Sequence, residues 1–98
     1  MVMIITFKNR ATTDIAEGLE SKASLKLLPQ QLHKNALLKL ALLNRIKTLS
    51  DLAHPGLHLE KLRGDKKGQC SLRINRQYRI CFMWKDDGAY NVEIIDYH

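Results

Sequence analysis

The sequence predicts an α+β fold in which an N-terminal strand and two helices pack on a small antiparallel sheet. Three observations support this class: an apolar run at the N-terminus, apolar residues at steps of three and four in the middle, and alternation with period two from Gln69 onward. A chain of 98 residues can bury one modest core. We therefore expect a single domain over residues 1–98.

The first third of the chain predicts a strand followed by a helix. The run Val2–Phe7 is short and apolar, as expected for a buried strand. Thr12 or Thr13 can cap a helix that begins after it. Gly18 indicates that this helix ends early, and a linker rich in Lys and Ser follows.

The middle of the chain predicts a longer helix. Pro29 suits its first position, and the helix is expected to run to about Leu49. Its apolar positions form one face: Leu32, Ala36, Leu40, Leu43 and Ile46. Residues 51–57, which include the triplet His54-Pro55-Gly56, predict a loop.

A β-hairpin follows. Gln69–Ile74 and Tyr78–Trp84 both alternate with period two, and residues 75–77 supply a turn. This register pairs Ile74 with Tyr78 and Leu72 with Ile80 on the core face. It also sets Arg73 opposite Arg79 on a face expected to be open to solvent. Like charges directly across a ladder are unfavourable unless an anion lies between them.

A second hairpin is expected around Asp86-Asp87-Gly88, with glycine where a three-residue loop needs positive φ. Pairing Lys85 with Ala89 then sets Val92 opposite Phe82 and Ile94 opposite Ile80. In this arrangement Cys70 and Cys81 point to opposite faces of the sheet, which argues against a disulfide between them.

The net charge of +6 is concentrated in one segment. Between Lys61 and Arg79 the only acid is Asp65, against seven basic residues: Lys61, Arg63, Lys66, Lys67, Arg73, Arg76 and Arg79. The basic and acidic residues elsewhere in the chain cancel. Such a concentration indicates a polyanionic partner, with membrane lipid or an acidic protein as alternatives to nucleic acid.

Other features narrow the class of protein. The two cysteines lack metal-ligand spacing to a histidine or to each other, so we expect neither a metal site nor a cofactor. No stretch approaches the roughly 18 apolar residues of a membrane span, and the N-terminal run is too short for a signal peptide. We expect a cytoplasmic protein that does not bind membranes.

The basic segment supplies groups that suit metal-free RNA cleavage, in which the 2′-hydroxyl attacks the adjacent phosphate. Such a site needs a base, an acid and cations for the charge that develops on phosphorus. Arg63, Arg73 and Arg79 can stabilise that charge, because the guanidinium fork matches two phosphate oxygens. Four further basic residues are expected to hold the RNA backbone: Lys61, Lys66, Lys67 and Arg76.

The C-terminal residues Asp96, Tyr97 and His98 can complete this site. His98 has an unperturbed pKa of about 6.5, which suits proton transfer near neutral pH. Asp96 can orient His98 or pair with an arginine, and Tyr97 can stack on a base or donate to phosphate. His58, next to the predicted loop, can also reach the sheet edge. A terminal histidine is as often a plain surface residue, and a lone loop histidine is more often solvent-facing.

Four stretches of the sequence resemble one known family. They are Leu59–Gln69 with its Leu-Arg-Gly-Asp, Ser71–Asn75 with Ser-Leu-Arg-Ile-Asn, Gln77–Phe82 with Tyr-Arg-Ile-Cys-Phe, and the terminal Asp-Tyr-His. This combination is similar to the HigB-type toxins of the RelE/ParE superfamily. The resemblance is specific over roughly residues 57–98, and the N-terminal part fits the same RelE-like, microbial ribonuclease-type fold loosely.

The resemblance implies a toxin of a type II toxin–antitoxin system that cleaves mRNA in the ribosomal decoding site. Its partners would be the ribosome, mRNA and a cognate antitoxin, expected to be a HigA-like helix-turn-helix protein. By position, Arg63, Arg73, Arg79, Asp96, Tyr97 and His98 would form the site. Some relatives carry a histidine just before the Leu-Arg-Gly-Asp motif, so the general base stays open among His98, His58 and Glu60.

Two other functions remain as alternatives. The same superfamily includes toxins that inhibit DNA gyrase, and fold alone does not separate them. The terminal Asp-Tyr-His beside facing arginines favours RNA cleavage. A non-catalytic RNA-binding module would interleave aromatics with the basic residues, whereas Tyr78, Phe82 and Trp84 are expected to face the core.

Overall fold

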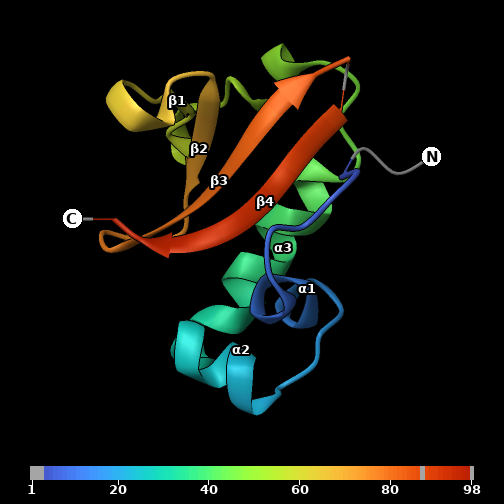
Figure 1. The fold of residues 1–98 in the computed structure, drawn as a ribbon, viewed down its shortest axis with the longest axis vertical. Helices are drawn as coiled ribbons and strands as arrows, with labels where there is room; N and C mark the ends of the chain where they lie inside the picture. Colours follow the sequence, from blue (N-terminus) through green and yellow to red (C-terminus); the bar gives the residue numbers. More distant parts are fainter. Residues whose placement is uncertain (1–3, 87, 98) are drawn as a thin grey trace.

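The computed structural model, which describes residues 4–86 and 88–97, has two layers: a four-stranded antiparallel sheet and a group of helices packed on one of its faces (Figure 1). The strands are β1 (Glu60–Lys61), β2 (Gln69–Arg73), β3 (Tyr78–Lys85) and β4 (Gly88–Asp96), and they lie side by side in chain order. The predicted α+β class is confirmed. The two-residue edge strand β1 was not expected from the sequence.

The first two helices are short, and both begin at polar caps. Helix α1 (Arg10–Ala16) is capped by Asn9, whose side chain accepts a hydrogen bond from the Thr12 amide, so neither threonine is the cap. Helix α2 (Lys22–Leu27) lies where a linker was predicted. That expectation was wrong because the Ser21 hydroxyl accepts from the Ser24 amide and starts a helical turn there.

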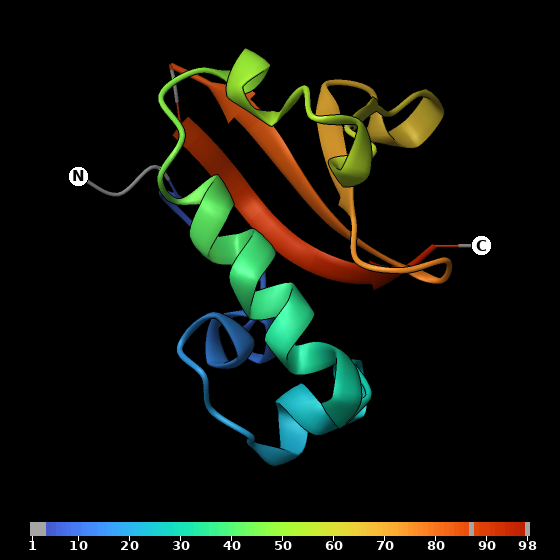
Figure 2. The same ribbon diagram turned by 180° about the vertical axis from the view of Figure 1, so that it is seen from behind.

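The longest helix, α3 (His33–Leu43), follows a 3₁₀ turn at Gln30–Leu32 and runs against the back of the sheet (Figure 2). It ends at Leu43, whereas the sequence predicted an end near Leu49. Residues 44–48 are not helical, and they lead to the 3₁₀ turn Leu49–Leu52. A further 3₁₀ turn, Pro55–Leu57, lies inside the predicted loop. Among the described residues no helix is long and apolar enough to cross a membrane.

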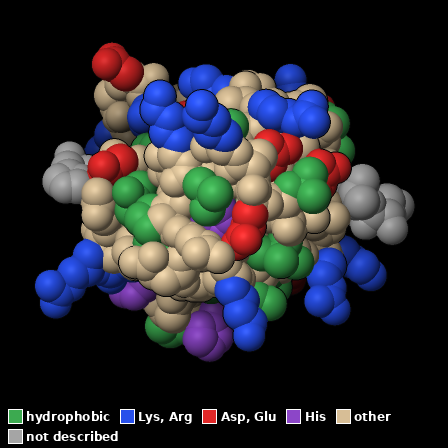
Figure 3. Space-filling view, turned by 90° about the horizontal axis from the view of Figure 1, so that it is seen from below, with side chains coloured by type: hydrophobic (Ala, Val, Ile, Leu, Met, Phe, Trp, Pro, Cys, Tyr) green, Lys and Arg blue, Asp and Glu red, His purple; other side chains and the backbone are tan. Residues whose placement is uncertain are grey.

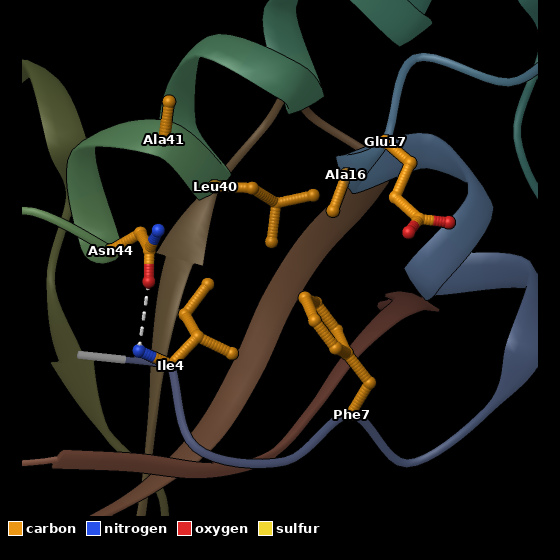
Figure 4. Close-up of a pocket in the computed structure, with 7 residues that line it drawn as sticks. All are labelled: Ile4, Phe7, Ala16, Glu17, Leu40, Ala41 and Asn44. Carbon is orange, nitrogen blue, oxygen red and sulfur yellow. Dashed lines mark hydrogen bonds between the residues drawn. The ribbon is translucent and has the colours of Figure 1, made fainter. Parts of the chain in front are cut away.

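The N-terminal segment runs beside β4 without forming a regular strand among its described residues. Ile4 and Phe7 make isolated parallel bridges to Ala89 and Val92, while Val2 and Met3 lie outside the described residues. The Ile4 amide donates to Asn44 Oδ1 at 3.0 Å, which ties this segment to the end of α3. Figure 4 shows Ile4, Phe7 and Leu40 around an apolar hollow of about 310 Å³.

The sheet register matches the prediction in β2 and β3 and differs by one residue at the second turn. Leu72 pairs with Ile80 and Arg73 with Arg79, as predicted. Lys85 pairs with Gly88 rather than Ala89, which makes the turn shorter than expected. The predicted pairing of Val92 with Phe82 falls within an irregularity between Cys81 and Met83.

Asn91 explains how the register recovers. Its φ of 53° places it in the left-handed region, where it forms the extra residue of a bulge in β4. The shorter turn and the extra residue cancel, so Ile94 pairs with Ile80 as predicted. The core then forms between the sheet and the helices, around Leu40, Leu72, Ile80, Phe82 and Ile94.

Candidate functional site

The face of the sheet that points away from the helices carries a partly buried polar cluster. Its buried members are Ser71, Arg79, Cys81 and Glu93. Cys70 lies in the core on the helix side and pairs in the ladder with Phe82, whereas Cys81 lies on this second face, and both thiols are free. The segment 58–66, which contains β1, contacts this face through the His58 carbonyl and Lys66. The sequence predicted that this face is open to solvent, and that prediction was wrong for its buried members.

Arg79 is the central residue of the cluster. Its side chain is only 8% exposed, which corrects the expectation that it lies on a solvent-exposed face. Nε donates to Ser71 Oγ at 2.7 Å, and Nη2 donates to the His58 carbonyl at 2.6 Å and the Ser71 carbonyl at 3.4 Å. A buried guanidinium requires such acceptors, because its charge has lost water.

The other edge of the Arg79 guanidinium faces the C-terminus. Its central carbon lies 5.5 Å from the centre of the Tyr97 ring, a distance typical of a cation–π contact. The three hydrogen bonds to described residues use Nε and Nη2. None of these three bonds uses Nη1.

A polar hollow of about 390 Å³ opens next to this contact. It is lined by Glu60, Lys61, Leu62, Arg63 and Tyr97. Arg63 is exposed there and precedes Gly64, which starts the 3₁₀ turn Gly64–Lys66 and whose φ of 66° favours glycine. The hollow thus joins an arginine, a lysine, a carboxylate and a phenol within one open space, a set that fits an anionic strand with exposed bases.

Glu93 holds the 3₁₀ turn against the sheet. Its carboxylate lies 3.8 Å from Lys66 Nζ and 3.6 Å from Lys8 Nζ. The neighbouring Cys81 side chain is fully buried, and burial raises the pKa of its thiol to about 11 despite the charge of Lys66 nearby. Lys66 therefore has a structural partner inside the protein, in addition to its predicted role in binding RNA.

Arg73 is not part of the hollow. Although it pairs with Arg79 in the backbone ladder, its Nε donates to the Asn75 carbonyl at 3.2 Å. Its charge acts on the helix side as well: burial, and secondarily Arg73, lower the pKa of Lys39. Asp96 accepts a hydrogen bond from Gln77 Nε2 at 3.0 Å, at the end of the β2–β3 turn.

The remaining predicted residues lie at the margins. The His58 side chain is exposed and its backbone is left-handed (φ 48°), so its carbonyl rather than its imidazole contacts Arg79. Lys67 and Arg76 are exposed, on the turn before β2 and the turn after it. His98 lies outside the described residues.

Sequence reasoning did not single out Ser71, Glu93 or the His58 carbonyl as parts of this site. For Ser71 a signal was present: it alternates with Arg73 on β2 and lies diagonally across from Arg79, so all three share a face. Glu93 pairs with Cys81 in the ladder and so lies on the same face. For the His58 carbonyl the residue type carries no signal, because the contact is made by the backbone.

Comparison with known proteins agrees with this architecture. Residues 12–98 match the family described as HigB-like toxin, the RelE-like toxin of the type II toxin–antitoxin system HigB. The chain is 40% identical over 90 residues to Toxin HigB-1 of Vibrio cholerae serotype O1, covering 91% of this chain and 92% of that protein.

A solved structure shares the fold at lower sequence similarity. The YoeB–YefM complex from Staphylococcus aureus contains a chain that superimposes with a TM-score of 0.60 at 16% identity, covering 97% of both chains. That likeness supports the RelE-like α+β fold. Together with the family match over most of the sequence, it leads to one conclusion: the chain belongs to the HigB family of RelE-like toxins of type II toxin–antitoxin systems.

Proposed function

We propose that this toxin is a ribosome-dependent endoribonuclease that cleaves mRNA in the decoding site. The observation that carries the proposal is the position of Arg79, which is fixed by Ser71 and the His58 carbonyl and lies beside Tyr97. Tyr97 in turn lines the hollow together with Arg63. Two arginines and a phenol near one open space suit a phosphodiester in a strand with unpaired bases.

In the proposed reaction the 2′-hydroxyl attacks its own 3′-phosphate and displaces the 5′-oxygen of the next nucleotide. Arg79 and Arg63 stabilise the charge that develops on the phosphoryl oxygens. Tyr97 stacks on a base or donates to phosphate, and His98 protonates the leaving oxygen. Arg73 and Asp96 support the same end of the sheet, through Asn75 and Gln77 respectively.

The general base is the part of the mechanism with the most alternatives. Glu60 lines the hollow, whereas the exposed imidazole of His58 is not among the groups that line it. This arrangement supports Glu60 over His58 as the group that receives the proton of the 2′-hydroxyl. His98 and a group of the ribosomal RNA are the other candidates.

The proposed partners follow from charge and family. Lys61, Lys66, Lys67 and Arg76 bind the mRNA or ribosomal RNA backbone electrostatically. A cognate antitoxin, HigA-like and with a helix-turn-helix, silences the toxin in the cytoplasm. Expression of the chain alone should then arrest bacterial growth, and co-expression with the antitoxin should restore it; normal growth with soluble toxin alone would contradict the toxin activity.

Translation in vitro followed by primer extension tests the nuclease directly. Cuts in phase with codons that appear only when ribosomes are present are the expected result. Arg45→Ala, at an exposed site near the end of α3, serves as a control that removes an arginine outside the hollow. Intact mRNA together with inhibited DNA supercoiling would instead identify a gyrase poison, the second function that this superfamily fold allows.

A further inference from the structure

A second hollow lies on the other side of β1. It has a volume of about 360 Å³ and is lined by Leu49, Lys61, Leu62, Lys67, Gly68, Gln69, Cys70 and Trp84. None of these residues belongs to the described cluster around Arg79. This volume lies within the range of sites that take small organic groups, roughly 300–1,000 Å³.

Trp84 gives the hollow an aromatic wall. It was expected to face the core, and it does pack against the core, but it is only half-buried and also lines this open space. Trp84 is the single tryptophan of the chain. An indole beside an open, largely apolar hollow is a platform on which a nucleobase can stack, whatever the base.

Two lysines place positive charge at the rim. Lys61 and Lys67 are both exposed, and neither forms an ion pair with any described residue. The lining contains no acid. Gly68 contributes no side chain to the rim. Its φ is +91°, and a Cβ built there would have open space around it. A ligand with a flat aromatic part and flanking negative charge fits this combination.

The two hollows are adjacent. Lys61 and Leu62 line both of them, so the space beside Tyr97 and the space beside Trp84 share part of a wall. A single strand of RNA that leaves the first hollow can pass over Lys61 and enter the second. The phosphate between two such nucleotides would lie against the Lys61 ammonium group.

We propose that the Trp84 hollow is a second nucleotide subsite, in which an RNA base stacks on Trp84 while Lys61 and Lys67 bind the adjoining phosphates. The proposal rests on the proposed function in that the ligand is the same RNA strand. It goes further by adding a base-binding position outside the catalytic hollow. It also gives a binding role to Trp84, which was expected only to face the core.

Tryptophan fluorescence offers a direct test without ribosomes. A short oligoadenylate should quench the emission of Trp84, because a stacked base contacts the indole. An abasic ribose-phosphate oligomer of equal length and charge should bind the lysines but leave the emission nearly unchanged. Equal quenching by both oligomers would overturn the proposal, and so would strong quenching by hexaglutamate, which would identify a site for acidic peptides.

Variants measured by anisotropy of labelled RNA separate stacking from charge. Trp84→Leu should weaken oligoadenylate binding roughly 5- to 100-fold, the scale of one base stack, without changing binding of the abasic oligomer. Trp84→Phe keeps a ring and should retain part of the affinity, and thermal melting checks that both variants fold. Lys67→Gln should weaken the binding of both the oligoadenylate and the abasic oligomer, and it should reduce the salt dependence of that binding.

Lys85→Gln is the matched control. Lys85 neighbours Trp84 in β3, but its ammonium lies 5.4 Å from the centre of the Tyr90 ring, on the opposite face of the strand. This change removes the same charge and should leave oligoadenylate binding as it is. An equal loss in Lys85→Gln and Lys67→Gln would mean that only the overall charge matters and would overturn the subsite.

The two proposals fail separately. Codon-phased cleavage on ribosomes combined with no quenching of Trp84 by oligoadenylate would overturn the subsite alone. Base-dependent quenching that is lost in Trp84→Leu, combined with mRNA that stays intact on ribosomes, would support the subsite and overturn the nuclease.

Discussion

At the scale of single residues, the best-defined feature is the way Arg79 is held. Burying a guanidinium is costly unless its N–H groups find acceptors. Here Ser71 provides both its hydroxyl and its carbonyl, and the left-handed backbone at His58 turns a second carbonyl toward Nη2. The side chain is therefore held in place by the protein itself, and the proposed role of Arg79 in stabilising phosphate charge requires such preorganisation.

Arg79→Ala should lower the rate of mRNA cleavage on ribosomes by about 10²- to 10³-fold, the scale reported for the loss of one oxyanion donor. Arg79→Lys should lose most of the same activity, because an ammonium cannot bond Ser71 and His58 while also reaching the phosphate. Single-turnover cleavage measures the effect, and Arg45→Ala is the control. A folded Arg79→Ala toxin with unchanged cleavage would exclude Arg79 from the reaction.

His98→Gln tests the proton-transfer role at the end of the chain. Glutamine keeps hydrogen-bonding capacity but does not titrate near neutral pH, so the cleavage rate should fall by about 10²-fold or more. The pH profile should also lose the limb that arises from imidazole. The measurement is the rate of cleavage on ribosomes as a function of pH. An unchanged rate and profile would move the proton transfer to Glu60, His58 or ribosomal RNA.

At the scale of elements, the bulge at Asn91 decides how β4 meets β3. The short turn at Lys85–Gly88 would by itself shift the rest of β4 by one residue and turn its apolar side chains to the wrong face. The extra residue at Asn91 restores the pairing of Ile94 with Ile80 and thereby sets the position of Tyr97 beside Arg79. The site thus depends on a backbone irregularity some distance from it.

Asn91→Val should destabilise the protein by about 1–2 kcal/mol, because a β-branched residue is strained in the left-handed region. Asn91→Gly should be nearly neutral, since glycine adopts this conformation without strain. Chemical denaturation of the two variants gives the comparison, and the bulge is the same in both. A Val variant as stable as the Gly variant would show that the left-handed backbone is not required there.

The sequence predicted the long or strongly patterned elements well and the short ones poorly. The alternation in β2 and β3 fixes their register, since a slip by one residue would expose Leu72 and Ile80. By contrast, α2 and β1 are too short for a periodic signal, and tertiary contacts decide whether they form. In the candidate site, Tyr97 and Arg63 were predicted from their chemistry, and both line the polar hollow, while their roles stay predictions. The burial of Arg79 was not predicted, because it depends on contacts with an aperiodic segment.

At the scale of the whole molecule, the sheet separates an apolar layer from a polar one. The helices cover the first face. Figure 3 shows the end of the molecule near α2, where acidic, basic and apolar side chains are mixed on the surface. The second face combines Arg79, Glu93 and Cys81 under the β1 segment. Packing on both faces gives this small chain a second buried layer that contains ionisable groups, which makes its stability depend on pH.

The Cys81 thiol predicts the direction of that dependence at alkaline pH. In the unfolded chain its pKa is near 9.0, whereas burial raises the pKa to about 11 in the fold. Between these values the unfolded state has released a proton that the folded state retains. The contribution of Cys81 to the free energy of unfolding is therefore fully present below about pH 9, and it is lost as the pH rises toward 11.

Denaturation at a series of pH values measures this loss of stability. Cys81→Ala should flatten the decline above pH 9, because it removes the titrating group. Cys70→Ala, which removes the other thiol with a pKa raised by burial, should flatten only the part that Cys70 contributes. The same slope in the parent and in Cys81→Ala would show that other groups cause the alkaline loss.

The contact between the N-terminal segment and β4 bears on how the protein folds. The Ile5 amide donates to the Ala89 carbonyl and the Lys8 amide to the Val92 carbonyl, so the N-terminal segment is held by a strand far from it in the sequence. Contacts this distant in sequence form late in folding. The strand that ends beside Tyr97 is also the strand that closes the fold. We therefore expect the N-terminal segment and the strand that ends beside Tyr97 to become ordered together, late in folding.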